Sequence, residues 1–401
     1  MTAVLEELKR PGAVSIIALV DALLSEAYAR RASDIHIEPT EYGVRVRLRV
    51  DGVLHDAYQL GKDIHAEVIS RIKVLAWLRT DEHAAAQDGR FRTWVADAPV
   101  DVRVSITPTY WGENAVLRLL ANNAEEHTLE TLGFSLADQR KILKAVRTSH
   151  GMVLATGPTG SGKTTTLYTL IKLLNKPDVS IVTVEDPIEY AIEGITQIQI
   201  NPRSGLTFGS GLRSLLRQDP DVIMVGEIRD TETAGIAVNT ALTGHLLLST
   251  LHTSDAATTL PRLLDMGVDP YLVASTVRLA VGQRLVRRIC GSCRQACALT
   301  AAQAHALAAA LPEDVDIGEE RFYEGQGCGE CGGTGYRGRT GVNEVFVVDE
   351  EVRDAILRKQ PAAVLKAMAV KNGMTTMFAD GLRKAALGLT TPAEVLRTIH
   401  D

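Results

Sequence analysis

The sequence predicts a two-part chain, in which a small α+β domain precedes a larger α/β domain with a mostly parallel sheet. Three observations carry this prediction. In the first part, apolar and charged residues alternate with a period of two, as in a half-buried strand. In the second part, short apolar runs alternate with segments of helical periodicity, which is typical of a parallel sheet covered on both faces. Between them, residues 122–131 are polar and weakly patterned, as in a linker.

The first domain is expected over residues 1–123, with a short helical lead at 1–30. The most regular strand pattern is Val-Arg-Val-Arg-Leu-Arg-Val at 44–50, and the Asp51-Gly52 pair after it indicates a hairpin turn. The remaining elements expected in this domain are a returning strand from 53, a helix at 64–78 and strands at 91–95 and 100–106.

The second domain is expected over residues 132–401, after a linker at 124–131. Four apolar runs in it have the length of buried strands: 152–156, 180–184, 222–225 and 246–250. The residues Leu167, Leu170, Ile171 and Leu174 recur at helical spacing after the first run. A glycine- and cysteine-rich subdomain is expected at about 286–341, and a helical part with a Gly-Met-Thr break at 348–401.

The composition is that of an ordinary globular protein, with 401 residues, 45% hydrophobic and 23% charged. A net charge of −6 argues against a protein built to coat nucleic acid, so no direct nucleic-acid partner is expected. No apolar stretch has the length of a membrane span, and residues 14–29 predict an amphipathic helix because Asp21 and Glu26 interrupt them. Without a signal-peptide pattern, we expect a cytoplasmic protein that reaches the membrane only through partners.

A complete phosphate-binding loop follows the first apolar run. Its residues match Gly-x-x-x-x-Gly-Lys-Thr and are Gly157, Pro158, Thr159, Gly160, Ser161, Gly162, Lys163 and Thr164, to which we add Thr165. Glycines let backbone N–H groups point at phosphate oxygens, and the helix expected near Lys163 adds the positive end of its dipole. Lys163 is expected to reach the β- and γ-phosphates, and the Thr164 hydroxyl to bind Mg²⁺. The loop predicts ATP and Mg²⁺ as ligands.

Acidic residues at strand ends are the candidates for the hydrolytic chemistry. Glu227 follows the third apolar run, at the edge where ligands of parallel sheets bind, and we assign it as the base that positions water. Gly226 stands where an Asp usually precedes that Glu, so Mg²⁺ would depend on Thr164, on phosphates and water, and on a second acid. Glu185 is the candidate for this second acid, and a solvated turn is the alternative for its segment.

A histidine lies on either side of the fourth apolar run. A neutral imidazole can hydrogen-bond a γ-phosphate or a bridging water, and so distinguish ATP from ADP. A single histidine beside an apolar strand is more often structural. The pair favours nucleotide sensing, and favours it more for His252 than for His245.

Two C-x-x-C pairs predict one structural Zn²⁺ site with no open coordination position. The four ligands are Cys290, Cys293, Cys328 and Cys331. An Ala-rich stretch at 300–311 lies between the pairs and is expected to form a helix, and Cys297 is left over as a free thiol. Redox activity is the alternative.

With these pieces in place, the chain resembles the secretion and pilus assembly ATPases, the motors of type II secretion and type IV pilus extension. The resemblance covers nearly all residues from about 15 onward and rests on six segments: ASDIHIEP at 32–39, QDGR at 87–90, DVRVS at 101–105, EDPIEY at 185–190, GEIRD at 226–230 and GYRGRTG at 335–341. It implies a RecA-like phosphate-loop NTPase domain after a PAS-like first domain. It also implies that Gly226 is a family trait.

The resemblance further implies a homohexamer in which the first domain of one copy approaches the γ-phosphate held by its neighbour. The cations that would do so are Arg90 and Arg103, with Arg118 a weaker match, and surface salt bridging is the alternative. The implied partner is the inner-membrane platform protein of a pilus or secretion system, with the motor at the inner face of the membrane. Four cysteines are usual in assembly motors and generally absent from retraction motors, so assembly is favoured. The alternatives are a retraction motor or a DNA-translocating ring ATPase.

Overall fold

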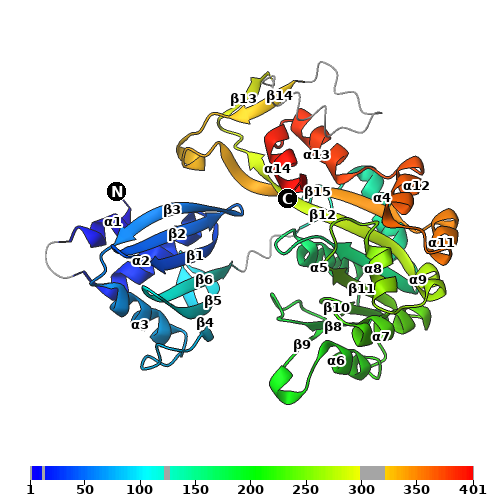
Figure 1. The fold of residues 1–401 in the computed structure, drawn as a ribbon, viewed down its shortest axis with the longest axis horizontal. Helices are drawn as coiled ribbons and strands as arrows, with labels where there is room; N and C mark the ends of the chain where they lie inside the picture. The colour runs from blue at the N-terminus through cyan, green and yellow to red at the C-terminus, as the bar shows by residue number, and fades with distance from the viewer. Residues whose placement is uncertain (1, 11–13, 122–126, 299–320, 401) are drawn as a thin grey trace. The chain divides into compact units, whose positions relative to one another are not determined.

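The computed structural model describes residues 2–10, 14–121, 127–298 and 321–400, and the chain divides into two compact units, Met1–Glu125 and Glu126–Asp401 (Figure 1). The helix expected at 300–311 and part of the expected linker lie outside the described residues. None of the described helices combines the length and the apolar character that a membrane span requires.

The first unit is a six-stranded antiparallel sheet with the strand order β3-β2-β1-β6-β5-β4. Its elements are α1 (Ala3–Leu8), α2 (Ile16–Ala29), β1 (Ala32–Pro39), β2 (Val44–Val50), β3 (Val53–Leu60), α3 (His65–Leu75), β4 (Gln87–Val95), β5 (Ala98–Thr109) and β6 (Gly112–Ala121). The amphipathic helix predicted at 14–29 and the helix predicted at 64–78 are confirmed as α2 and α3.

The period of two in β2 sorts its side chains between the two faces of the sheet. Val44, Val46 and Leu48 are buried in a core shared with α2 and α3, while the arginines between them lie on the opposite face. At the β2–β3 turn, Asp51 and Gly52 both have positive φ, at 50° and 87°, as a two-residue hairpin turn requires. The predicted hairpin is therefore confirmed.

The second unit contains a seven-stranded sheet with the order β15-β12-β7-β11-β10-β8-β9. All neighbours pair in parallel except β15, which runs antiparallel to β12 at the edge. The strands are β7 (Gly151–Thr156), β8 (Ile181–Glu185), β9 (Thr196–Gln199), β10 (Val222–Val225), β11 (Leu246–Leu251), β12 (Val277–Ile289) and β15 (Tyr336–Val347). The four predicted apolar strands are confirmed, and with them the α/β class.

Helices cover this sheet on both faces. The helices before residue 290 are α4 (Leu136–Val146), α5 (Lys163–Leu174), α6 (Phe208–Leu215), α7 (Thr231–Leu242), α8 (Thr259–Asp265) and α9 (Pro270–Thr276), with a 3-10 turn η1 (Pro202–Ser204) between β9 and α6. The helical stretch predicted near the C-terminus forms α11 (Glu350–Leu357), α12 (Ala362–Lys371), α13 (Met377–Ala386) and α14 (Pro392–His400).

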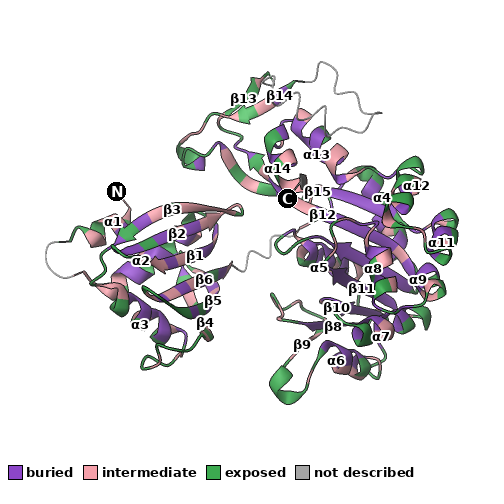
Figure 2. Ribbon diagram, viewed as in Figure 1, coloured by how far each residue is buried: buried purple, intermediate pink, exposed green. Residues whose placement is uncertain are grey.

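The central strands are buried along their length (Figure 2), and their successive side chains belong to two separate cores. Met152 and Leu154 pack with α6 to α9, α11 and α12, whereas Val153 and Ala155 pack with α4 and α5. Each fully buried aliphatic side chain contributes about 1.5–3 kcal/mol. Because β7, β8, β10 and β11 are parallel and buried, their carboxyl ends are held at one edge of the sheet. A small two-stranded sheet, β13 (Arg294–Cys297) with β14 (Phe322–Gly325), and a 3-10 turn, η2 (Gly329–Cys331), precede β15.

Candidate nucleotide site and metal centre

The predicted phosphate loop connects the end of β7 to the start of α5. Gly157, Gly160 and Gly162 have φ values of 145°, 79° and 88°, which favour glycine at all three positions. A Cβ on Gly157 would also lie 2.4 Å from the carbonyl oxygen of Gln283, so this position has no room for a side chain. Gly162 is the N-cap of α5, and the first helical residue is Lys163. The loop therefore presents the backbone N–H groups of a helix N-terminus at the sheet edge.

Lys163 is 8% exposed and folds back over the loop. Its Nζ donates to the carbonyl oxygens of Gly157 at 2.8 Å and Pro158 at 2.9 Å. Burial lowers the pKa of Lys163 to about 8; Glu227 opposes this shift, and the positive charge of Arg284 adds to it. A buried cation without a contacting carboxylate among the described residues is electrostatically suited to a polyphosphate.

Two hydroxyl groups show that the loop fits a nucleotide phosphate. The Ser161 Oγ is buried and has no hydrogen-bond partner among the described residues, so a ligand oxygen would satisfy it. Thr164 is exposed on the first turn of α5, where its hydroxyl is accessible to a cation. Thr165 lies beside it and accepts a hydrogen bond at its carbonyl from Thr169.

Glu227 and His252 come together at the ends of neighbouring parallel strands. Glu227 follows β10 and is 9% exposed, and His252 follows β11. The Nε2 of His252 lies 3.1 Å from Glu227 Oε2, and Arg229 Nη2 lies 2.5 Å from Glu227 Oε1. The Arg229 contact was not foreseen, although the residue lies within the quoted GEIRD segment. The Glu227 carboxylate is thus held on both oxygens.

The hypothesis that His245 senses nucleotide is wrong for this fold. His245 precedes β11, and its carbonyl accepts from the N–H of Gly151, the first residue of β7. The phosphate loop follows the last residue of β7, so His245 lies at the opposite edge of the sheet. Its Nδ1 is 3.2 Å from the Thr240 carbonyl oxygen. His245 therefore lies away from the phosphate loop, and its side chain contacts the backbone of α7.

Glu185 lies at the end of β8 but is buried in a hydrogen-bond network of its own. It is 2% exposed, and its carboxylate accepts from Tyr168 of α5, from Thr183 Oγ1 at 2.5 Å and from Gln197 Nε2 at 3.1 Å. None of its described contacts is with Lys163 or Glu227. Glu185 therefore links α5, through Tyr168, to β9, through Gln197. The structure does not place it in contact with Glu227 or His252.

The predicted arginines of the first unit lie in one row across its sheet, on the face opposite the helices. Strand register places Arg118 opposite Arg103, and Arg103 opposite Arg90, on three consecutive strands. Asp34 is next in the row; Arg118 Nε donates to its Oδ1 at 2.8 Å. Like charges directly opposite one another on antiparallel strands destabilise a sheet. The row therefore indicates a surface suited to an anion.

Two residues beside the loop were not predicted as site residues. Gln283 is fully buried, accepts from Thr166 Oγ1 at 2.8 Å, and has no described partner for its Nε2. Arg284 follows it on β12. Only the parallel pairing of β12 with β7, which sets Gly282 opposite Thr156, places them at the loop. This pairing joins segments far apart in sequence, so no local pattern reveals it.

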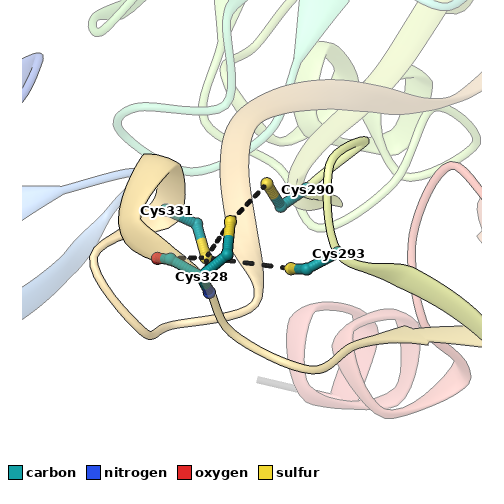
Figure 3. A group of neighbouring side chains, drawn as sticks. All are labelled: Cys290, Cys293, Cys328 and Cys331. Carbon is teal, nitrogen blue, oxygen red and sulfur yellow. Dashed lines mark hydrogen bonds between the residues drawn. The ribbon is translucent and has the colours of Figure 1, made fainter.

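The four predicted zinc ligands form one cluster (Figure 3). The Sγ–Sγ distances are 3.8 Å for Cys290–Cys328, 3.9 Å for Cys293–Cys331 and 3.8 Å for Cys328–Cys331. A tetrahedron with Zn–S bonds of about 2.3 Å has edges of about 3.8 Å, whereas a disulfide needs about 2.05 Å. The backbone N–H groups of Cys328 and Gly335 donate to Cys331 Sγ. The donor set therefore fits Zn²⁺, and Cys297 lies outside the cluster.

Comparison with known proteins supports the resemblance found in the sequence. The profile of a family described as "Type II/IV secretion system protein" matches residues 9–397. The type II secretion system protein HxcR of Pseudomonas aeruginosa is 46% identical, over 96% of this chain and 78% of that protein. The type IV pilus assembly ATPase PilB of Thermus thermophilus is 45% identical over 95% of this chain, which spans 43% of that protein.

Solved structures show the same fold. The ATPase DotB of Legionella pneumophila has a TM-score of 0.70 at 24% identity and covers 97% of each chain. The pilus retraction motor PilT has a TM-score of 0.61 at 24% identity and covers 94% of this chain. These likenesses concern the fold alone, whereas the family match covers nearly the whole sequence. The chain is therefore a member of the type II/IV secretion system protein family, among relatives that serve type II secretion and type IV pilus assembly.

Proposed function

We propose that this chain is one subunit of a ring-shaped, Mg²⁺-dependent ATPase that drives the assembly of pilin or pseudopilin subunits in type IV pilus extension or type II secretion. The observation that carries the proposal is the meeting of three features at one sheet edge. These are the phosphate loop with its buried Lys163, the restrained carboxylate of Glu227, and His252 bonded to it. Family membership gives this chemistry its biological context.

In the proposed mechanism, the loop N–H groups and the Lys163 ammonium hold the β- and γ-phosphates. Glu227 orients the attacking water, and Arg229 and His252 keep its carboxylate in place from two sides. When bound with the nucleotide, Mg²⁺ neutralises charge on the phosphate oxygens, and the Thr164 hydroxyl would hold it there. His252 is half exposed, so it also remains accessible to a γ-phosphate.

The arginine row of the first unit supports a site completed by a second copy of the chain. Arg90 is exposed, and strand register sets Arg90, Arg103 and Arg118 side by side on three neighbouring strands. Such a surface would stabilise the charge that develops on a γ-phosphate, and an arginine in this role is worth on the order of a thousandfold or more in rate. We propose a homohexamer in which Arg90 and Arg103 act on a neighbour's nucleotide.

Assembly is favoured over retraction because the four-cysteine cluster is intact and has the spacing for Zn²⁺. The proposed partner is a platform protein of the inner membrane, with the motor on its cytoplasmic side. DNA translocation is disfavoured by the net charge of −6.

The test is ATP hydrolysis by the purified full chain with and without Mg²⁺, and with the cytoplasmic domain of a platform protein from the same cell. We expect Mg²⁺-dependent turnover that rises when the platform domain binds. The control is Lys163→Ala, which should abolish turnover. Turnover that survives this substitution would place hydrolysis elsewhere, and stimulation by DNA in place of the platform domain would favour a translocase.

A further inference from the structure

We propose that Arg284 contacts the terminal phosphates of a nucleotide bound to its own chain, and that it distinguishes ATP from ADP. This inference rests on the proposed ATPase function and extends it. Arg284 belongs to the second unit, which also carries the phosphate loop, so it would act in addition to any arginine supplied by another copy.

The position of Arg284 follows from strand pairing. Strand β12 runs parallel to β7, with Gly282 opposite Thr156, and continues beyond the point where β7 ends. The next residues of β12 therefore lie alongside the phosphate loop. A Cβ built on Gly157 would lie 3.2 Å from Arg284 Nη1. The guanidinium thus lies against the first glycine of the loop.

The same guanidinium reaches the segment that follows His252. Its Nη2 donates to the carbonyl oxygen of Ser254 at 2.8 Å, and its Nη1 to that of Gln283 at 3.3 Å. Arg284 therefore joins β12 to the segment after β11 across the end of β7. Ser254 is two residues from His252, whose Nε2 lies 3.1 Å from Glu227 Oε2, so the arginine contacts the segment next to the proposed hydrolytic group.

The first glycine marks the side of the loop that faces the β- and γ-phosphates. A phosphate-loop lysine reaches those two phosphates, and here Lys163 Nζ bonds the carbonyls of Gly157 and Pro158. Lys163 also feels the charge of Arg284, which lowers its pKa further. The two cations therefore flank the same space, and a polyphosphate would relieve their repulsion.

The charge of Arg284 has no contacting counter-ion in the described part of the chain. Its two hydrogen bonds are to neutral carbonyls. Two carboxylates are near enough to act on its charge, but each is held by other groups: Asp255 forms its ion pair with Lys366 at 2.9 Å, and Glu344 accepts from the N–H groups of Ala256 and Met377. A half-buried guanidinium without a carboxylate partner, placed at a phosphate loop, is the arrangement of an anion ligand.

The alternative is that Arg284 is only a strap that holds the Ser254 segment in place. The two roles predict different binding patterns. A strap would affect ATP and ADP alike, and an uncharged donor would largely replace it. A γ-phosphate ligand would affect the triphosphate selectively, and the positive charge would matter.

The experiment is isothermal calorimetry on the full chain with Mg²⁺ and either ADP or the non-hydrolysable ATP analogue AMP-PNP. Four proteins are compared: the parent, Arg284→Gln, Arg284→Lys and the control Arg288→Gln, which alters an exposed arginine of the same strand. We expect Arg284→Gln to weaken AMP-PNP binding about tenfold or more, with ADP much less affected. Arg284→Lys should recover much of the difference, and Arg288→Gln should match the parent.

Equal loss for both nucleotides, or no loss, would overturn the phosphate contact. Thermal unfolding of each variant identifies a strap: a lowered Tm with equal nucleotide effects would establish that role and overturn ours. If Arg284→Gln does not fold, Arg284→Met replaces it as the uncharged variant, and the same selective loss of AMP-PNP affinity is required. A parent chain that binds neither nucleotide would instead refute the proposed ATPase itself.

Discussion

The buried ammonium group of Lys163 sets the electrostatics of the phosphate loop. It is removed from water and held by two carbonyl oxygens, and burial outweighs the attraction of Glu227, so its pKa falls to about 8. The folded chain therefore binds this proton less tightly than the unfolded chain, and the charged form costs stability below pH 8. That cost diminishes as the pH rises from 8 towards 10.5. Bound phosphates would act in the opposite direction, since they favour the ammonium form.

The first prediction is a pH dependence of nucleotide affinity. Above about pH 8, binding must take up a proton on Lys163, so the affinity for Mg²⁺–ADP should fall as the pH rises, by up to about tenfold per unit. Calorimetry between pH 7 and 9.5, in buffers of different ionisation enthalpy, measures both the affinity and the proton uptake. Lys163→Arg is the control, because a guanidinium keeps its proton across this range. A parent affinity that stays constant with no proton uptake would contradict the assignment.

The second prediction concerns the carboxylate of Glu227, which two neighbours hold in one orientation. Glu227→Gln keeps the shape but removes the charge that orients water, so kcat should fall on the order of a hundredfold or more. Binding of AMP-PNP should change little. Steady-state turnover and calorimetry measure the two effects, with the exposed Glu193→Gln as the matched control. Hydrolysis at the parent rate would remove Glu227 from the mechanism.

At the scale of elements, local sequence was sufficient for the phosphate loop and most of the strands and helices. A continuous apolar run such as 152–156 is typical of a strand buried on both faces, and the complete Gly-x-x-x-x-Gly-Lys-Thr match identifies the loop after it. The relations between elements were harder to predict. His245 and His252 look equivalent in sequence, because only the direction of β11 within the sheet separates their edges. Likewise, the partners that bury Glu185 come from α5 and β9.

The third prediction concerns the metal centre as a structural element. The purified chain should contain one Zn²⁺, and Cys328→Ser should lower both the zinc content and the free energy of unfolding, the latter by about 3 kcal/mol or more, because it removes a ligand from a closed site. Elemental analysis and thermal unfolding check both effects. Cys297→Ser, outside the cluster, should leave both unchanged. Full zinc content in Cys328→Ser would refute the four-thiolate site.

At the scale of the whole molecule, we propose that the two units of the chain contribute to catalytic sites completed between copies. The second unit has the phosphate loop and the proposed base Glu227, while the first unit has a row of arginines on three neighbouring strands. Burial of the Lys163 ammonium costs free energy, and so does a like charge placed directly opposite another on neighbouring strands. If the arginines of one copy contact the nucleotide of another, the charge of the bound phosphates would offset both costs.

The most direct test of this account is complementation between two inactive variants of the full chain. Lys163→Ala removes the nucleotide site and keeps the arginines, and Arg90→Ala with Arg103→Ala does the reverse. Each variant alone should show little turnover, with AMP-PNP binding retained only by the arginine variant. When the two are mixed and allowed to exchange subunits, we expect ATP hydrolysis to recover, because arginines of one subunit complete the site of the other. A mixture as inactive as its components would contradict a site shared between copies.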